Sequence, residues 1–593
     1  MLFLTCIPLI SCVTASVFIL LIVVGHPLDK NDINWAETGA ETHPLVVDTV
    51  YGPVLGLLLS EGVQAYLGIP YAKPPVGELR WYPPVEPTPW APDLLEALQV
   101  SPGCPQNCFD ATPEMFCPRQ VDEDCLYLNI WSPRDANPSS NLPVILFIHG
   151  GSYNTWSASA PLFDGRYVTE MSNVIFVNFN YRLGTLGWLK TEGEDGSTGN
   201  YGLMDQRAAM KFVQENIRNF GGNPERVTLN GQSAGAQAIT LHMTNPATDT
   251  FFHQVIIQSN PITIPLANIS EAIQLSTKFS AYLNCTINDI VCLRNQSVDN
   301  IIWAQEKSSS APINDRNPLL WFEQWGPVID GIEILQHPLV EIAKGNIQHK
   351  PIIIGDVTNE IAGYIHSLFP TPPPQIAVLS ILAAYFGRFT LPVLREYWTY
   401  WNPDIRPLLI ELGSDYIFVC SSRNMTRSIE SFSNSPVYHY VLNHTFSDTS
   451  VWTTSPYCET PGVTCHDTDL FFTLYSLTLS GYNYSPSERR LAQSMMSYWA
   501  NFVHSGDPNN FEWQSNDVTH QSGSDINYSK NIFWHRYLNE TGWSSLYFQT
   551  PLNKDISNFR QNECDLLDLV GYNGPVGPLK LYENELCEKL RTK

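Results

Sequence analysis

Ser233 lies in the segment Gly231-Gln-Ser-Ala-Gly235, which follows the β-rich run Val227–Asn230 and precedes a helix-forming segment. Small residues around the serine let a strand turn abruptly into a helix, which leaves the hydroxyl exposed at the turn. A serine held in this way can attack a carbonyl carbon. Five residues are a weak signal alone, because a turn of glycine, serine and alanine before a helix is often only a loop. The chemistry therefore also needs a base, an acid and hydrogen-bond donors from elsewhere in the chain.

The elements that would position these groups follow from the apolar pattern. Continuous apolar runs at 143–148 and 174–179 predict strands buried on both faces. Between the second run and Ser233, residues 202–222 repeat apolar side chains at helical spacing. Later runs at 255–257, 351–354 and 437–442 add further strands, and residues 487–504 form a strong amphipathic helix. This order predicts an α/β fold with a mostly parallel, doubly wound sheet, interrupted by helix-rich insertions at 265–320 and 370–430.

Composition narrows the class of protein. The 593 residues carry a net charge of -25, which argues against a nucleic-acid partner because phosphate would be repelled. Thirteen cysteines and eight Asn-x-Ser/Thr sites favour an oxidising, secretory compartment. Neither Cys-x-x-Cys pairs nor a His-Glu-x-x-His helix occurs, so we expect no bound metal and no cofactor. The glycosylation sites begin at Asn268, Asn284, Asn295, Asn424, Asn443, Asn483, Asn527 and Asn539.

The first 25 residues are almost wholly apolar, and polar sequence starts at His26. We interpret residues 1–25 as a secretory signal peptide, which leaves a secreted protein with no stable membrane span. The alternative is an uncleaved N-terminal membrane anchor, because the segment is near the length that spans a bilayer. Residues 26–575 then form one catalytic domain, and residues 576–593 form a C-terminal tail.

Several further landmarks occur in a fixed order between about residues 45 and 565. The chain resembles type-B carboxylesterases of the cholinesterase-like group, which have the α/β-hydrolase fold. The matching segments are 66–80, 123–129, the His149-Gly-Gly turn, 199–206, 219–224, 231–236, 327–331, 498–502 and 506–509.

This resemblance implies a catalytic triad. The family's acid ends a Gly-x-x-x-x-Glu pattern, which Gly355-Asp-Val-Thr-Asn-Glu360 matches. Its histidine follows a glycine-bearing loop and precedes an acidic helix start, which indicates His466. The order Ser233, Glu360, His466 is the one this fold uses. His466 is then the base for Ser233, Glu360 orients the imidazole, and backbone N–H groups of Gly151, Ser152 and Ala234 form the oxyanion hole.

Two positions depart from the family pattern. Ser152 stands where a third glycine is usual, which costs roughly 1 to 2 kcal/mol if the turn needs a positive φ. Gln232 replaces a glutamate before the serine and removes a negative charge that would attract a cation. Residues 105–124 also lack the tryptophan that holds quaternary ammonium in cholinesterases, so uncharged or lipid-like esters fit better. By resemblance, Trp321 and Glu323 fall near the acyl pocket, although both are equally consistent with a surface loop.

The resemblance also implies the disulfides Cys104–Cys125, Cys285–Cys292 and Cys420–Cys564. Proximity in sequence adds Cys108–Cys117 and Cys458–Cys465. Cys587 in the tail remains, and we expect it to form an intermolecular disulfide in a dimer.

A secreted serine esterase acting on small-molecule carboxylic esters is the first hypothesis. A catalytically silent adhesion or binding protein of the same fold is the second, and a lipase is the third. A lipase would need a mobile apolar lid, for which residues 101–120 and 366–385 are candidates.

Overall fold

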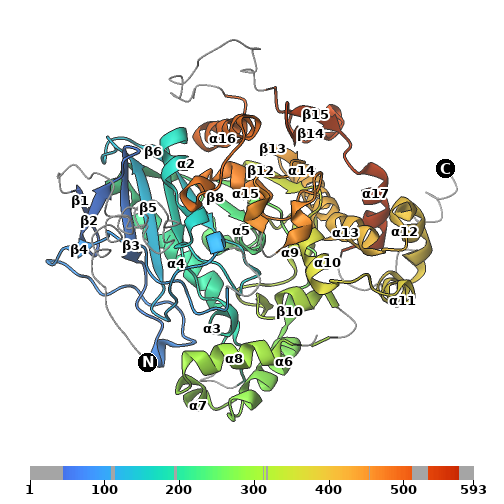
Figure 1. Cartoon of the computed structure of the whole chain (residues 1–593). Coiled ribbons are helices and arrows are strands. Elements are labelled where there is room, and N and C mark those ends of the chain that lie inside the picture. Colours follow the sequence, from blue (N-terminus) through green and yellow to red (C-terminus); the bar gives the residue numbers. More distant parts are fainter. Residues whose placement is uncertain are drawn as a thin grey trace, which may run out of the picture. The chain divides into compact units, whose positions relative to one another are not determined.

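The apolar runs of the sequence form the middle of a 13-stranded sheet in a computed structural model of the protein (Figure 1). The structure describes residues 45–108, 114–192, 197–310, 313–314, 318–452, 455–510 and 532–572. The strands lie in the order β1-β2-β3-β5-β7-β6-β8-β9-β12-β13-β14-β15, and β4 pairs with β2. A separate two-stranded sheet contains β10 and β11. Their bounds are β1 Leu45–Thr49, β2 Gly52–Leu58, β3 Val63–Pro70, β4 Leu95–Glu96, β5 Tyr127–Pro133, β6 Leu142–Ile148, β7 Ile175–Phe179, β8 Gly222–Gln232, β9 Gln254–Gln258, β10 Ala267–Asn268, β11 Val328–Ile329, β12 Ile352–Val357, β13 Val437–Leu442, β14 Ser544–Phe548 and β15 Lys554–Ser557.

The middle of the sheet is parallel. Strands β7, β6, β8, β9, β12, β13 and β14 each run parallel to the next. Strands β7, β9, β12 and β13 are buried along their whole length. A parallel sheet is covered on both faces, which is why these segments appear in the sequence as near-continuous apolar runs. The predicted α/β class with a mostly parallel sheet is confirmed.

The N-terminal part of the sheet is antiparallel. Strands β1, β2 and β3 form antiparallel hairpins, and β5 joins β3 to β7 with antiparallel pairing on both sides. These strands extend the sheet at one edge, so the parallel strands that carry the candidate site lie away from that edge.

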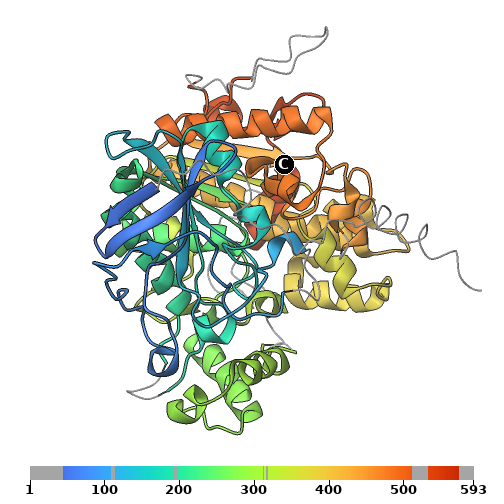
Figure 2. The ribbon, with the colours of Figure 1, turned by 60° about the vertical axis from the view of Figure 1, so that its left-hand side comes forward.

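Helices follow most of the parallel strands. Their bounds are α2 Arg166–Ser172, α3 Gly184–Trp188, α4 Tyr201–Asn216, α5 Ala234–Met243, α6 Ile269–Tyr282, α7 Ile290–Arg294, α8 Val298–Ser308, α9 Pro338–Ala343, α10 Ala362–Leu368, α11 Gln375–Phe386, α12 Thr390–Glu396, α13 Arg406–Ser414, α14 Cys420–Phe432, α15 Thr468–Thr473, α16 Pro486–Ser505 and α17 Gln561–Val570. The two helix-rich insertions of the sequence contain α6–α8 and α11–α14. In both views α6–α8 form a group of their own below the strands, whereas α16 lies along their upper side (Figures 1 and 2).

Local sequence explains where α16 begins and ends. The Ser485 side chain accepts a hydrogen bond from the Glu488 backbone, and the Glu488 side chain accepts one from the Ser485 backbone, which together make a capping box. At the other end Gly506 has a φ of 76°, a conformation that glycine adopts without strain. The helix packs on β6 and β8. Its bounds extend the predicted segment 487–504 by one residue at each end.

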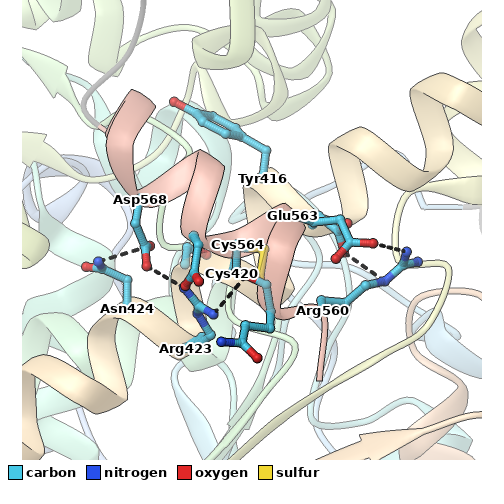
Figure 3. The surroundings of a disulfide bond; sticks show 12 residues. Tyr416, Cys420, Arg423, Asn424, Arg560, Glu563, Cys564 and Asp568 are labelled. Carbon is cyan, nitrogen blue, oxygen red and sulfur yellow. Dashed lines mark hydrogen bonds and ion pairs between the residues drawn. A yellow bond between two sulfur atoms is a disulfide. The ribbon is translucent and has the colours of Figure 1, made fainter. Parts of the chain in front are cut away.

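Five disulfides staple the described residues. They are Cys104–Cys125, Cys108–Cys117, Cys285–Cys292, Cys420–Cys564 and Cys458–Cys465, the same pairs that the sequence analysis expects. Figure 3 shows Cys420–Cys564, which joins α14 to α17. Beside it, Arg423 of α14 forms ion pairs with Asp565 and Asp568 of α17. Covalent and ionic contacts therefore fix the last helix to the insertion.

Several predictions fall outside the described residues. The expected signal peptide at 1–25, the tail at 576–593 with Cys587, and the Asn527 site are among them. Within the part of the chain that the structure describes, one helical stretch, Gln375–Glu396, is long and apolar enough by composition to cross a membrane, with a mean hydropathy of 1.7. It comprises α11, a 3-10 turn at Gly387–Phe389 and α12, and Val378, Leu382 and Phe386 of α11 are buried in the core.

Candidate active site

Ser233 occupies a sharp bend between β8, which ends at Gln232, and α5, which begins at Ala234. Its backbone has a φ of 56° and a ψ of -127°, a region that costs an ordinary residue of order 1–3 kcal/mol. The two flanking glycines make the bend possible because their neighbours leave no room for side chains. A Cβ at Gly235 would lie 2.1 Å from the carbonyl oxygen of Ile148, and one at Gly231 would lie 2.8 Å from the carbonyl carbon of Gly235. The sequence motif thus folds as a nucleophile elbow.

Hydrogen bonds on both sides hold the strained serine in place. The Ser233 N–H donates to the carbonyl of Gln258 on β9 at 3.0 Å, and the Ser233 carbonyl accepts from the Gln237 N–H at 2.9 Å. These backbone contacts compensate for the unfavourable dihedral angles, as a rigid scaffold must at such a site. The side chain is buried, with 5% of the residue exposed.

Glu360 and His466 come together beside this bend. Glu360 follows β12, and its Oε1 accepts a hydrogen bond from the Val357 N–H at 2.8 Å. Its other oxygen, Oε2, is hydrogen-bonded to Nδ1 of His466. The carboxylate therefore fixes the tautomer that carries the proton on Nδ1 and leaves the lone pair on Nε2, the form that a general base requires.

The loops that carry these two residues are joined directly. The Asn359 N–H donates to the carbonyl of Thr464 at 3.0 Å, and the Thr464 N–H donates to Oδ1 of Asn359 at 3.1 Å. The disulfide between Cys458 and Cys465 closes the second loop immediately before the histidine. These contacts thus hold together two catalytic candidates, Glu360 and His466, that lie more than 100 positions apart in sequence.

Nε2 of His466 contacts the elbow through Gln232. It lies 3.2 Å from Nε2 of Gln232, and the same Gln232 amide donates to Oδ1 of Asp467 at 2.9 Å. Oδ1 of Asp467 is itself 3.5 Å from Nε2 of His466. Across the described residues, Ser233 Oγ forms no hydrogen bond with His466. Catalytic contacts of this kind are often long in the absence of substrate and tighten in the Michaelis complex.

Charge around His466 is concentrated and negative. Burial lowers the pKa of His466, but Asp467, Glu360 and Asp469 together raise it to about 9. Burial raises the pKa of Asp467 to about 6, against the lowering effect of the histidine. Burial and the neighbouring charge of Glu360 raise the pKa of Asp356, whose Oδ1 accepts a hydrogen bond from Ser422. The imidazole is therefore strongly stabilised in its protonated form.

The turn after β6 lies against the elbow. A Cβ at Gly150 would sit 3.0 Å from Cβ of Ser233. Gly151 and Ser152 both have positive φ, at 89° and 51°. Throughout the described residues, the N–H groups of Gly151, Ser152 and Ala234 have no hydrogen-bond acceptor in the protein. Gly151 and Ser152 are partly buried and Ala234 is buried, and three such free N–H groups next to the Ser233 bend could hold an oxyanion.

Glu323 provides a further buried carboxyl group near the candidate active site. It ends the 3-10 helix η6, Pro318–Glu323, and is fully buried near Gln237, which also accepts a hydrogen bond from Tyr153 Oη at 2.8 Å. Burial raises the pKa of Glu323 to about 8, against the lowering effects of Gln237 and His466. Its Oε2 has no partner among the described residues. Trp321, by contrast, is 38% exposed and donates to the carbonyl of Ser309, so only Glu323 of this pair is buried beside the site.

Sequence reasoning missed two residues at the site. Asp467 is adjacent to the expected histidine, but no spacing rule indicates that its side chain turns back to Gln232. Trp156 lies next to the oxyanion turn, since a Cβ at Gly150 would be 2.9 Å from its ring, and it stacks on Phe116 with centroids 4.6 Å apart. An aromatic ring therefore borders the site although residues 105–124 contain no tryptophan. No group of three or more potential metal ligands occurs within the described ranges.

The family model that matches this chain is described as the carboxylesterase family, and it covers residues 43–566. The chain belongs to the carboxylesterase family. Among curated relatives, the cAMP-regulated D2 protein of Dictyostelium discoideum is 34% identical over 91% of this chain and 95% of its own length. The crystal protein of the same organism is 31% identical, covering 87% and 91%. An acetylcholinesterase of Bungarus fasciatus is 32% identical, covering 78% and 79%.

Membership of this family accounts for the large, mostly parallel sheet with many helices, and it confirms the resemblance read from the sequence. The carboxylesterase family and the acetylcholinesterase relative support an ester hydrolase in general terms. The identity of the residues that act in this chain is a separate question, which the geometry of the elbow addresses.

Proposed function

We propose that this protein is a serine carboxylesterase that hydrolyses small-molecule carboxylic esters through an acyl-enzyme on Ser233. The observation that carries the proposal is the joint placement of three features. The elbow presents Ser233, the Glu360–His466 pair lies beside it, and three N–H groups without acceptors surround it. Any one of these features occurs in proteins without catalysis, but their coincidence at one bend fits acyl transfer.

The reaction assigns one role to each group. His466 takes the proton from Ser233 Oγ as that oxygen bonds to the ester carbonyl carbon, and the N–H groups of Gly151, Ser152 and Ala234 stabilise the oxyanion. Loss of one such donor typically costs about 3 to 4 kcal/mol in the barrier. His466 then gives the proton to the leaving alcohol. Water attacks the acyl-enzyme in the second half-reaction, with His466 again as base, and Glu360 stabilises the imidazolium in both steps.

Hydrolysis of p-nitrophenyl esters of increasing chain length tests the proposal. Purified wild-type protein and Ser233→Ala are compared, and we expect the variant to lose at least about 10³-fold in kcat/KM, in line with loss of a nucleophile. An organophosphate should label Ser233 and block activity. Equal turnover by the two proteins, or a label at another residue, would contradict the assignment.

The silent binding protein is the second candidate, and one observation favours it. Nε2 of His466 contacts Gln232 and Asp467 in place of Ser233. A chain that never reacts with organophosphate and never releases p-nitrophenol from any ester would support this alternative. A lipase is the third candidate, and a preference for long acyl chains presented at an oil surface would identify it.

Export and assembly belong to the same proposal. Five intramolecular disulfides support an oxidising compartment, and we propose that the protein is secreted after cleavage at about residue 25, with Cys587 linking two copies. A non-reducing gel of secreted protein should show a dimer that Cys587→Ser abolishes. A monomer band alone would remove the dimer.

A further inference from the structure

Asp467 is the residue beside the proposed active site whose placement calls for a functional explanation. It directly precedes α15 and has a φ of 76°, a left-handed conformation that disfavours a residue with a side chain. It is half-buried, and its side chain is 15% exposed. Its Oδ1 accepts a hydrogen bond from the Gln232 amide at 2.9 Å. A carboxylate at a strained position, bonded to the residue that precedes the nucleophile, has a strong geometric link to catalysis.

Gln232 and Asp467 contact Nε2 of His466. Nδ1 is hydrogen-bonded to Glu360, so only Nε2 can take the proton of Ser233. In the structure Nε2 lies 3.2 Å from the Gln232 amide and 3.5 Å from Asp467 Oδ1. Gln232 Oε1 has no partner among the described residues, whereas its amide N–H groups donate to Asp467 Oδ1 and, when the imidazole is neutral, can donate to Nε2 of His466.

We propose that Asp467 is a positioning residue that, together with Gln232, holds Nε2 of His466 in a resting contact which the imidazole must leave before it can serve Ser233. The catalytic part of this inference rests on the proposed esterase function. The contact between Asp467, Gln232 and His466 does not depend on that function, because it involves only these three side chains.

Electrostatics adds a consequence. Asp467 places a second carboxylate on the imidazole, on the side opposite Glu360, and both carboxylates stabilise the protonated ring. The titratable groups that face His466 from the surrounding elements are Glu360, Asp356, Asp467, Asp469, Glu323 and Tyr364. Of these, Asp467 contributes most to raising the pKa of His466 to about 9.

The sign of the expected effect follows directly. A base must be unprotonated, so kcat/KM rises as pH increases through the pKa of His466. Removing the charge of Asp467 lowers that pKa, and the rise then occurs at a lower pH. A neutral residue at 467 should therefore raise kcat/KM at pH 7 several-fold, because a larger fraction of the imidazole is unprotonated at that pH.

Two variants test the proposal. Asp467→Asn keeps the size of the side chain without the charge, and Asp467→Gly also relieves the left-handed backbone. We expect both to move the midpoint of the pH profile of kcat/KM to a lower pH. Glu459→Gln removes an exposed charge from the same loop without contacting His466 and should leave the midpoint unchanged. A wild-type midpoint in Asp467→Asn would overturn the proposal.

A second readout does not depend on hydrolysis. Exchange of the C2 hydrogen of His466, followed by mass spectrometry between pH 5 and pH 10, reports the titration of this one imidazole. We expect Asp467→Asn to lower its midpoint in a Ser233→Ala background. An unchanged midpoint overturns the role of Asp467 even if the esterase is active. If the midpoint moves but no ester is cleaved by the wild type, the proposed function fails and the contact between the side chains stands.

Discussion

Ser152 shows, at the scale of one residue, how a turn tolerates a side chain that its backbone disfavours. Its φ of 51° lies in the left-handed region, where a residue other than glycine costs roughly 1–2 kcal/mol. Only its N–H is needed to hold an oxyanion, and its carbonyl accepts a hydrogen bond from the Asn154 side chain at 2.6 Å. The hydroxyl therefore adds nothing that the proposed chemistry requires.

Ser152→Gly should be more stable and equally active. We expect the free energy of unfolding to rise by about 0.5–1 kcal/mol, since relief of the left-handed strain exceeds the entropy that glycine adds to the unfolded chain. Thermal unfolding and p-nitrophenyl acetate turnover measure the two effects. Ser152→Val is the matched control, and it should lower both because a β-branched residue resists positive φ. A loss of kcat in the glycine variant would show that the hydroxyl takes part.

Glu323 makes stability depend on pH. Burial raises its pKa to about 8 from an ordinary value of 4.5, so the folded protein keeps a proton that the unfolded chain releases. The stabilisation is complete below about pH 4.5 and is lost as pH rises towards 8. Glu323→Gln keeps a neutral side chain at every pH, and we expect its melting temperature to exceed that of the wild type by more at pH 8 than at pH 5.

Scanning calorimetry at the two pH values measures this difference. Glu396→Gln, at an exposed position at the end of α12, should change the melting temperature equally at both. If the gap between wild type and Glu323→Gln is the same at pH 5 and pH 8, then Glu323 does not hold its proton in the folded protein.

The family resemblance nominated Glu360 and His466, which the structure brings together, but it did not predict the contacts around them. A glycine-based pattern and the chain order were enough to nominate these two residues, because both lie in loops that follow parallel strands. Gln232 suggested that the site had lost a negative charge, yet its amide is bonded to Asp467, 235 positions further along the chain. A carboxylate thus stands near the elbow after all. The residue types at positions 232 and 467 do not predict this contact, because tertiary packing decides which loops meet.

At the scale of elements, the strands and long helices were easier to predict than the turns that end them. The predicted strands and the helices at 201–216 and 486–505 appear close to their expected bounds because their apolar period is strong. The helical spacing of residues 202–222 does not predict that α4 ends at Asn216 and continues as a 3-10 turn at Ile217–Phe220. Periodicity locates an element well, but the geometry of its last turn depends on local hydrogen bonds.

Two disulfides should separate activity from stability. Cys458–Cys465 closes a short loop directly before His466, whereas Cys420–Cys564 closes a loop with a sequence separation of 144. Chain entropy gives roughly 2–3 kcal/mol for the first and about 5 kcal/mol for the second. We therefore expect the double variant Cys458→Ser/Cys465→Ser to lose more kcat than the double variant Cys420→Ser/Cys564→Ser. The second double variant should show the larger fall in melting temperature.

Turnover and thermal unfolding of the two double variants provide the comparison. Each double variant serves as the control of the other, because both lose one disulfide and gain two hydroxyls. Equal losses of kcat would show that the loop before His466 is held by its hydrogen bonds to Asn359, without help from the disulfide.

For the whole molecule, the distribution of glycosylation sites bears on the proposed secretion. Five of the candidate asparagines are exposed: Asn268, Asn284, Asn295, Asn483 and Asn539. Asn424 differs, because it is half-buried on α14 and its amide donates to Asp568 of α17 at 3.2 Å (Figure 3). A glycan there would disturb this hydrogen bond between α14 and α17.

We expect glycans at the exposed positions and none at Asn424. Enzymatic release of the glycans in ¹⁸O-labelled water, followed by peptide mass spectrometry of the secreted protein, marks each occupied asparagine. Asn539→Gln, at an exposed site, should lower the apparent mass by one glycan, whereas Asn424→Gln should not change it. A labelled Asn424 would contradict the arrangement of α14 and α17.

The two glycines of the elbow and its serine are under different constraints. A Cβ at Gly235 would lie 2.1 Å from the Ile148 carbonyl oxygen, so this glycine is required wherever β6, β8 and α5 pack in this way. By contrast, loss of the Ser233 hydroxyl would create no steric clash. A descendant that binds a partner without cleaving esters is therefore free to lose Ser233 but must retain Gly235. In a survey of related chains the glycines report the shared fold, whereas Ser233 is the residue whose loss the proposed mechanism would not tolerate.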